Sequence, residues 1–95
     1  MVPVPTEGVY TIYTKNDCSY CTKVKELLKH ESVMIINCDS YLESDRSLFL
    51  QTMDSLTGRM HRTFPFVFHH TRFIGGYDDT LEYKRGLEIQ FNEEF

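Results

Sequence analysis

The motif Cys-Ser-Tyr-Cys at residues 18–21 constrains the fold more than any other feature of this chain. It follows an apolar, strand-like run over residues 9–14 and opens an amphipathic, helix-like run over residues 19–30. At a strand-to-helix junction, two cysteines at this spacing are typical of a redox-active dithiol. The rise per helical residue places Cys18 at the N-terminal tip of the helix and Cys21 one turn inside it.

The two cysteines are predicted to differ in reactivity. Unpaired N–H groups and the positive end of the helix dipole stabilise a thiolate on Cys18, and Lys15 adds a nearby cation. Asp17 acts in the opposite sense, because a neighbouring carboxylate raises the pKa of a thiol. We expect the helix end and Lys15 to outweigh Asp17, which can turn away as an N-cap. Cys21 faces inward and should keep a higher pKa, which suits it to resolve a disulfide.

A structural zinc site is the main alternative for a Cys-x-x-Cys pair, but it needs two further ligands at matching spacing. Cys38 is the only other cysteine, and no second pair of ligands follows it. His69 and His70 are adjacent, so on a strand their side chains would point to opposite faces. Redox chemistry is therefore favoured over zinc. We expect Cys38 to be a buried, apolar residue at a strand end, and all four histidines to lie at the surface.

Length, charge and cysteine count exclude several classes of function. The 95 residues are enough for one domain with a single core, so we expect residues 1–95 to form one domain after an irregular lead-in over residues 1–8. A net charge of −4 without a basic stripe argues against nucleic acid as a partner. No apolar run reaches spanning length and no leader-like segment is present, so we expect no membrane association. Three cysteines, an odd and low count, predict a reducing, cytoplasmic setting.

Hydrophobic periodicity predicts a strand–helix–strand unit in the first half of the chain. Strands over residues 9–14 and 33–38, both expected to be buried, flank the helix over 19–30, and this order requires a parallel pair with a right-handed crossover. A second helix is predicted to begin at a Ser44 cap and to end at Gly58. Its buried face would hold Phe49, Met53 and Leu56, with Met60 as a further candidate.

The second half of the chain predicts a hairpin followed by a helix. Residues 66–74 are typical of two short strands joined by a tight connection. A third helix is predicted to begin at Asp78 or Asp79 and to be interrupted by Gly86. The tail over residues 87–95 fits a last helical turn and a period-two strand equally, and both alternatives stay open.

Three motifs in order carry a resemblance to a known family. They are Lys-x-x-Cys-x-Tyr-Cys at residues 15–21, Thr-x-Pro at residues 63–65 and Gly-Gly-x-Asp-Asp at residues 75–79. With them the chain resembles the glutaredoxins from about Val9 to Gly86. The resemblance implies an α/β, thioredoxin-like fold with a four-stranded mixed sheet flanked by three or more helices. It also implies glutathione as the reductant.

The resemblance further implies roles for particular residues. A cis Phe64–Pro65 bond would expose the backbone of Phe64, which could pair with glutathione as an added strand. The N–H groups of Tyr77 and Asp78 would bind the γ-glutamyl carboxylate, and Asp79 would accept from the α-amino group. Lys15 and Tyr20 would meet the glycine end. The implied catalytic pair is Cys18 and Cys21, and the implied glutathione-binding residues are Lys15, Tyr20, Thr63, Phe64, Pro65, Gly76, Tyr77, Asp78 and Asp79.

The activity that the resemblance implies is reduction of protein disulfides and glutathione mixed disulfides by a monomer, with ribonucleotide reductase as a family partner. The chain departs from the common family pattern at Ser19, Phe64 and Tyr77, where many members have Pro, Val and Cys. Some members with Cys-Ser-Tyr-Cys bind a [2Fe-2S] cluster between two protomers through the first cysteine and two glutathiones, which is an alternative role for Cys18. A scaffold that docks partners without redox turnover is a third alternative.

Overall fold

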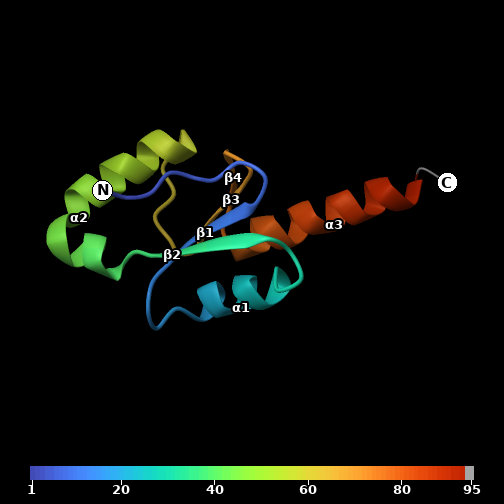
Figure 1. The fold of residues 1–95 in the computed structure, drawn as a ribbon, viewed down its shortest axis with the longest axis horizontal. Helices are drawn as coiled ribbons and strands as arrows, with labels where there is room; N and C mark the ends of the chain where they lie inside the picture. The colour runs from blue at the N-terminus through green and yellow to red at the C-terminus, as the bar shows by residue number, and fades with distance from the viewer. Residues whose placement is uncertain (94–95) are drawn as a thin grey trace.

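A computed structural model describes the backbone of residues 1–93 and the side chains of residues 1–89. Its elements are, in order, β1 (Tyr10–Thr14), α1 (Ser19–Leu27), β2 (Val33–Asn37), α2 (Asp39–Thr57), β3 (Phe66–His69), β4 (Arg72–Gly75) and α3 (Tyr77–Glu93). The strands form one mixed sheet in the order β2-β1-β3-β4, with α1 and α3 against one face and α2 against the other (Figure 1). The predicted sheet and helices are therefore confirmed.

Strand β1 is central and divides the core into two parts. It runs parallel to β2 and antiparallel to β3, which confirms the predicted strand–helix–strand unit. Because side chains alternate along a strand, Ile12 packs toward Val24 and Leu28 beside α1, whereas Tyr13 packs toward Phe49 and the rest of α2. The buried core on both faces fixes the end of β1, from which the loop to Cys18 leaves.

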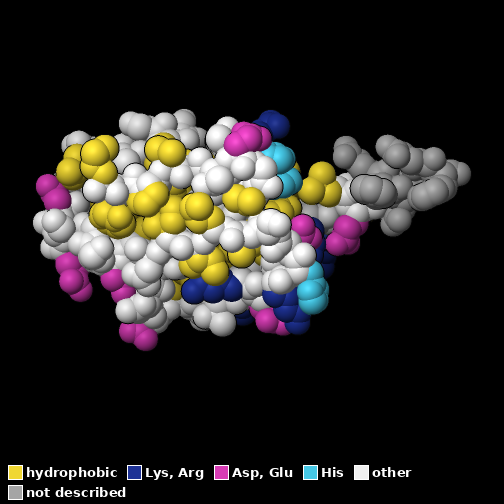
Figure 2. Space-filling model, in the orientation of Figure 1, with side chains coloured by type: hydrophobic (Ala, Val, Ile, Leu, Met, Phe, Trp, Pro, Cys, Tyr) yellow, Lys and Arg dark blue, Asp and Glu magenta, His cyan; other side chains and the backbone are white. Residues whose placement is uncertain are grey.

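Strand β2 lies at the edge of the sheet, so the prediction that it is buried is wrong. Val33, Met34 and Ile35 are 37%, 39% and 48% exposed, and only Ile36 is buried. Figure 2, in the orientation of Figure 1, shows apolar side chains gathered across the middle of the face toward the viewer. An apolar run of this kind predicts a strand. Its composition does not say whether that strand lies inside the sheet or at its edge.

Helix α2 consists of two segments that meet at Asp45. The backbone of Asp45 is extended, with φ −158° and ψ 92°, and its Oδ1 accepts a hydrogen bond from the N–H of Leu48 at 3.1 Å. Asp45 therefore caps the second segment, and the prediction of Ser44 as the cap is wrong by one residue. Gly58 ends the helix in the left-handed conformation, as predicted. Met60 lies beyond this end and is 77% exposed, so it is not part of the buried face.

Helix α3 begins at Tyr77 and continues through Gly86, so the predicted interruption is wrong. A single glycine costs a helix only about 1 kcal/mol, which neighbouring turns offset. Residues 87–93 are helical, which decides between the two alternatives for the tail, and residues 94–95 lie outside the described part of the chain. Figure 1 shows this end of α3 projecting beyond the sheet. No helix within residues 1–93 has the length and apolar character needed to cross a bilayer.

Candidate active site

The two cysteines of the motif lie at the start of α1 and form a disulfide. Cys18 is the N-cap residue, and its Sγ accepts a hydrogen bond from the N–H of Cys21 at 3.2 Å. Cys18 is half-buried, whereas Cys21 is only 2% exposed. Solvent and substrate therefore reach Cys18 first, and its sulfur lies at the positive end of the helix, where the N–H of Cys21 points at it.

The loop between β1 and Cys18 is held by hydrogen bonds to the residues that follow β2 and end it. The N–H of Asn16 donates to Asp39 Oδ1 at 3.1 Å, and Asn37 Nδ2 donates to Asn16 Oδ1 at 3.0 Å. Asp17 is exposed and adopts a left-handed conformation with φ 54°. It does not cap the helix, so the predicted N-cap role of Asp17 is wrong. Cys18 occupies that position, because its sulfur accepts the first-turn N–H that a capping oxygen would take.

A second loop, which leads into β3, shares a groove with Tyr20 of the cysteine motif. Its Phe64–Pro65 bond is cis, as predicted. The ring of Phe64 stacks on Phe49 of α2 at 6.0 Å between centroids and meets Phe66 edge-on at 5.1 Å. The ammonium group of Lys15 lies 5.7 Å from the centroid of the Phe64 ring. The aromatic residue at position 64 is thus anchored in the core, and Lys15 is drawn toward this loop.

The third part of the site is the N-terminus of α3, which Gly75 makes possible. Gly75 has φ 139°, and a Cβ at this position would collide with the carboxylate of Asp79. The main-chain N–H and Oγ1 of Thr80 both donate to the carbonyl oxygen of Gly76, at 3.0 and 2.7 Å. The first turn of α3 is therefore fixed, with its N–H groups available to an anion.

These three parts enclose a groove of about 330 Å³. It is lined by Tyr20, His61, Thr63, Phe64, Pro65, Gly76, Tyr77, Asp78 and Asp79. The structure therefore gathers the predicted glutathione-binding residues in one place, except for Lys15, which lies outside the groove lining. The rings of Tyr20 and Tyr77 face each other across one side at 6.0 Å, and the ammonium group of Lys23 lies 4.9 Å from the Tyr20 ring centroid.

His61 is the groove residue that the sequence interpretation missed. It was expected to be an ordinary surface histidine, but its ring packs edge-on against Phe66 and Phe73 at 4.9 and 5.3 Å. The only sequence signal was its position two residues before Thr63, in the loop that carries the cis proline. The position of His61 in the sequence does not show whether its side chain lines a groove or extends into solvent.

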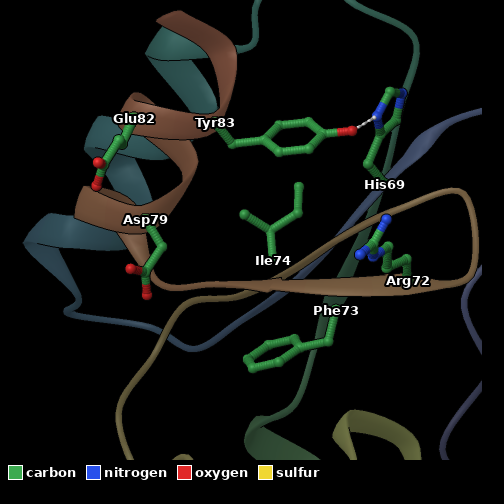
Figure 3. A pocket seen from close by; sticks show the side chains of 7 residues that line it. All are labelled: His69, Arg72, Phe73, Ile74, Asp79, Glu82 and Tyr83. Atoms are coloured by element: carbon green, nitrogen blue, oxygen red, sulfur yellow. Dashed lines mark hydrogen bonds between the residues drawn. The ribbon is translucent and has the colours of Figure 1, made fainter. Parts of the chain in front are cut away.

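A further pocket lies between the β3–β4 hairpin and α3 (Figure 3). Asp79 lines both cavities. His69 is half-buried here and shares a 2.6 Å hydrogen bond with the Tyr83 hydroxyl, so it is not a surface residue as expected. Its ring also stacks on that of His70 at 4.3 Å, which contradicts the prediction of opposite faces. The reason is the left-handed backbone of His70, with φ 56°, which ends the strand alternation.

Two remaining sequence interpretations concern Cys38 and zinc. Cys38 is fully buried at the end of β2, as predicted. Among the side chains of residues 1–89, no three His, Cys, Asp or Glu residues gather in a way that could hold a metal ion.

The fold and the site together define a class of protein. A dithiol at the N-terminus of the first helix, a cis proline at the start of β3, and a four-stranded mixed sheet between helices are the features of thioredoxin-like proteins with a dithiol site.

Comparisons with known proteins give the family within this class. The glutaredoxin family model matches residues 10–74. Glutaredoxin-C5, chloroplastic, of Arabidopsis thaliana is 37% identical over 87 residues, which cover 90% of this chain and 48% of that protein. The chain belongs to the glutaredoxin family, and it spans about half the length of this curated relative.

Two solved structures share the fold. A buckwheat glutaredoxin–glutathione complex has a TM-score of 0.65 and 32% sequence identity, covering 81% of this chain and 68% of that one. The holo form of glutaredoxin C1 from Populus tremula x tremuloides has a TM-score of 0.69 and 30% identity, covering 90% of this chain and 75% of that one. The predicted thioredoxin-like fold is confirmed.

Proposed function

We propose that this chain is a glutathione-dependent thiol–disulfide oxidoreductase that acts through Cys18. The observation that carries the proposal is the asymmetry of the dithiol: a half-buried sulfur at a helix tip is bonded to a buried one. The groove bordered by Tyr20, two residues after Cys18, supports a peptide-like co-substrate. The buckwheat relative was solved as a glutathione complex, which supports that tripeptide.

The reaction begins with the reduced dithiol. The Cys18 thiolate attacks the glutathione sulfur of a mixed disulfide, and the substrate sulfur leaves as a thiolate that takes a proton from water. Cys18 is then joined to glutathione. A second glutathione thiolate attacks the glutathione sulfur of this adduct, which releases oxidised glutathione and restores the Cys18 thiolate. Alternatively, Cys21 attacks Cys18, releases glutathione and closes the internal disulfide, which glutathione later opens.

The groove accounts for selection of the glutathione moiety in this scheme. The backbone of Phe64 pairs with the extended tripeptide, and the N–H groups of Tyr77 and Asp78 hold its γ-glutamyl carboxylate. Asp79 accepts from the α-amino group. Lys15 lies outside the groove lining, beside the ring of Phe64, and its ammonium group would meet the glycine carboxylate.

The role of each cysteine is tested by replacing it with serine. Cys18→Ser is expected to abolish reduction of a glutathione mixed disulfide, because no nucleophile remains at the helix tip. Cys21→Ser is expected to retain much of the activity, because glutathione itself resolves the adduct. Turnover is measured in a glutathione-coupled assay, and equal loss in both variants would contradict these roles. If the Cys18 thiol alkylated with an ordinary pKa of about 8.5, a scaffold without turnover would be favoured instead.

A [2Fe-2S] cluster is a second candidate function, which Ser19 between the cysteines favours. Cys18 offers one accessible sulfur, and the described residues gather no ligand cluster around it, so the remaining sulfur ligands must come from a second protomer and from glutathione. Anaerobic reconstitution with iron and sulfide, followed by visible absorption and sizing, tests this role. A colourless monomer would exclude it. Ribonucleotide reductase as a substrate, a monomeric catalytic state and a cytoplasmic location stay predictions.

A further inference from the structure

We infer that His61 is a binding residue of the groove, whose ring donates a hydrogen bond to the γ-glutamyl carboxylate and makes affinity for glutathione adducts increase as pH falls. The inference rests on the proposed function, because it assumes that glutathione occupies the groove. It adds a residue outside the three sequence motifs and a pH dependence that these motifs do not supply.

The position of the ring carries the inference. Phe66 and Phe73 contact the ring edge-on, so one side of it packs against the core. Its Cε1 and Nε2 atoms face Gly76, at 3.6 and 3.8 Å from where a Cβ of that residue would lie. Nε2 is also 3.4 Å from the hydroxyl of Thr63. The polar edge of the ring therefore points into the groove beside the first turn of α3, where the carboxylate is proposed to bind.

The charges around the ring determine how protonation affects binding. Asp78 and Asp79 of α3 line the same groove, as do the rings of Tyr20 and Tyr77. Among the nearby cations, the ammonium groups of Lys23 and Lys15 lie over the rings of Tyr20 and Phe64, at 4.9 and 5.7 Å from their centroids. Arg62 is paired with Asp54 at 2.6 Å, and the guanidinium carbon of Arg59 lies 4.7 Å from the Phe73 ring centroid. Both arginines thus have other contacts. A protonated His61 would be the cation that lines the groove itself.

A histidine gains its charge between about pH 8 and 5, whereas the carboxylates of glutathione are already ionised there. Protonated His61 makes a charge-assisted hydrogen bond to the anion, and the neutral ring makes a weaker one. The expected result is a Michaelis constant for a glutathione mixed disulfide that is lower at pH 6 than at pH 8.

The test compares His61→Phe with the wild type at pH 6 and pH 8. Phenylalanine keeps the edge-on packing but removes both ring nitrogens, so KM is expected to increase about three- to tenfold at pH 6, with less change at pH 8 and little change in kcat. His61→Gln keeps an N–H donor that does not titrate, so its KM is expected to be intermediate and independent of pH. His30→Phe, at an exposed histidine in the turn after α1, is the matched control and should behave as the wild type.

The substrate identifies which end of the tripeptide His61 binds. A cysteinylglycine mixed disulfide lacks the γ-glutamyl group, so the variants should not differ on it, whereas they should differ on a γ-glutamylcysteine mixed disulfide. If the wild type reduces glutathione and cysteinylglycine adducts equally well, the proposed function is wrong. If the wild type prefers glutathione but both His61 variants match its KM at both pH values, the role of His61 is overturned and the proposed function stands.

Discussion

A single buried thiol, Cys38, shows how position decides reactivity at the scale of one residue. Burial, with a smaller contribution from the nearby charge of Asp39, raises the pKa of the Cys38 thiol to about 12. At pH 8 the fully buried thiol is therefore protonated, and no reagent reaches it.

The expected outcome is selective alkylation of the reduced protein. Iodoacetamide at pH 8 should label Cys18 first, and it should label Cys38 only after the chain is unfolded in denaturant. Mass spectrometry of peptides taken at successive times measures the order. Labelling of Cys38 in the folded protein at the rate of Cys18 would contradict it.

Gly75 carries a second prediction at this scale. Replacing it with alanine should destabilise the protein by about 1–2 kcal/mol, because a positive φ is unfavourable for a residue with a Cβ and that Cβ meets the Asp79 carboxylate. Gly76→Ala is the matched control, since a Cβ there finds ordinary contact distances of 3.6 Å or more. Urea unfolding of both variants measures the difference. Equal stability of the two would show that Gly75 is not required.

At the scale of an element, α2 depends on a cap inside what is otherwise one helix. Asp45→Ala should lower the free energy of unfolding by about 1 kcal/mol, because the N–H of Leu48 loses its acceptor. Asp45→Asn should retain most of the stability, since the amide oxygen accepts the same hydrogen bond. Ser44→Ala should change little, which separates the observed cap from the one that the sequence suggested. Thermal unfolding of the three variants decides between them, and a larger loss at Ser44 would contradict the assignment.

The elements also show which signals in the sequence are sufficient. β1 and the end of α2 at Gly58 were predicted correctly, because β-branched and aromatic composition and a glycine stop act locally. The edge position of β2 depends on what packs beside that strand, and the continuation of α3 through Gly86 depends on what packs beside that helix. The sequence of one segment does not identify its neighbours in the folded protein. The cap at Asp45 was missed by one residue because Ser44 and Asp45 are both good capping residues.

At the scale of the whole molecule, the part of the site that the three motifs form was predicted from the sequence. The three motifs placed Tyr20 of the cysteine motif, the cis-proline loop and the start of α3 around one groove, since each motif sits at the end of a strand of the sheet. His61 and His69 were missed for a different reason. Their surroundings come from Phe66 and Phe73 in one case and from Tyr10 and Tyr83 in the other, and these contacts exist only once the sheet and helices have assembled.

His69 therefore reports on the assembled molecule, because it joins three of its elements. Its ring lies in β3, stacks on Tyr10 of β1 at 4.1 Å, and shares its hydrogen bond with Tyr83 of α3. Burial, together with the neighbouring His70, lowers the pKa of His69 in the folded protein, although Glu31 and Glu7 act in the opposite sense. The unfolded chain then binds a proton at a higher pH than the folded chain does. Between the two pKa values the unfolded state carries more protons, so stability increases with pH.

The prediction is that the free energy of unfolding falls as pH decreases from about 7.5 to 5.5, below the ordinary histidine pKa of about 6.5. His69→Gln can keep a hydrogen bond to Tyr83 but does not titrate in this range, so its stability should depend less on pH than that of the wild type. Urea unfolding at both pH values measures the two slopes, and His30→Gln, at an exposed position, serves as the control. Because carboxylates contribute equally to all three proteins, only the difference in slope belongs to His69. Identical slopes for the wild type and His69→Gln would mean that the ring is as easily protonated in the folded protein as in the unfolded chain.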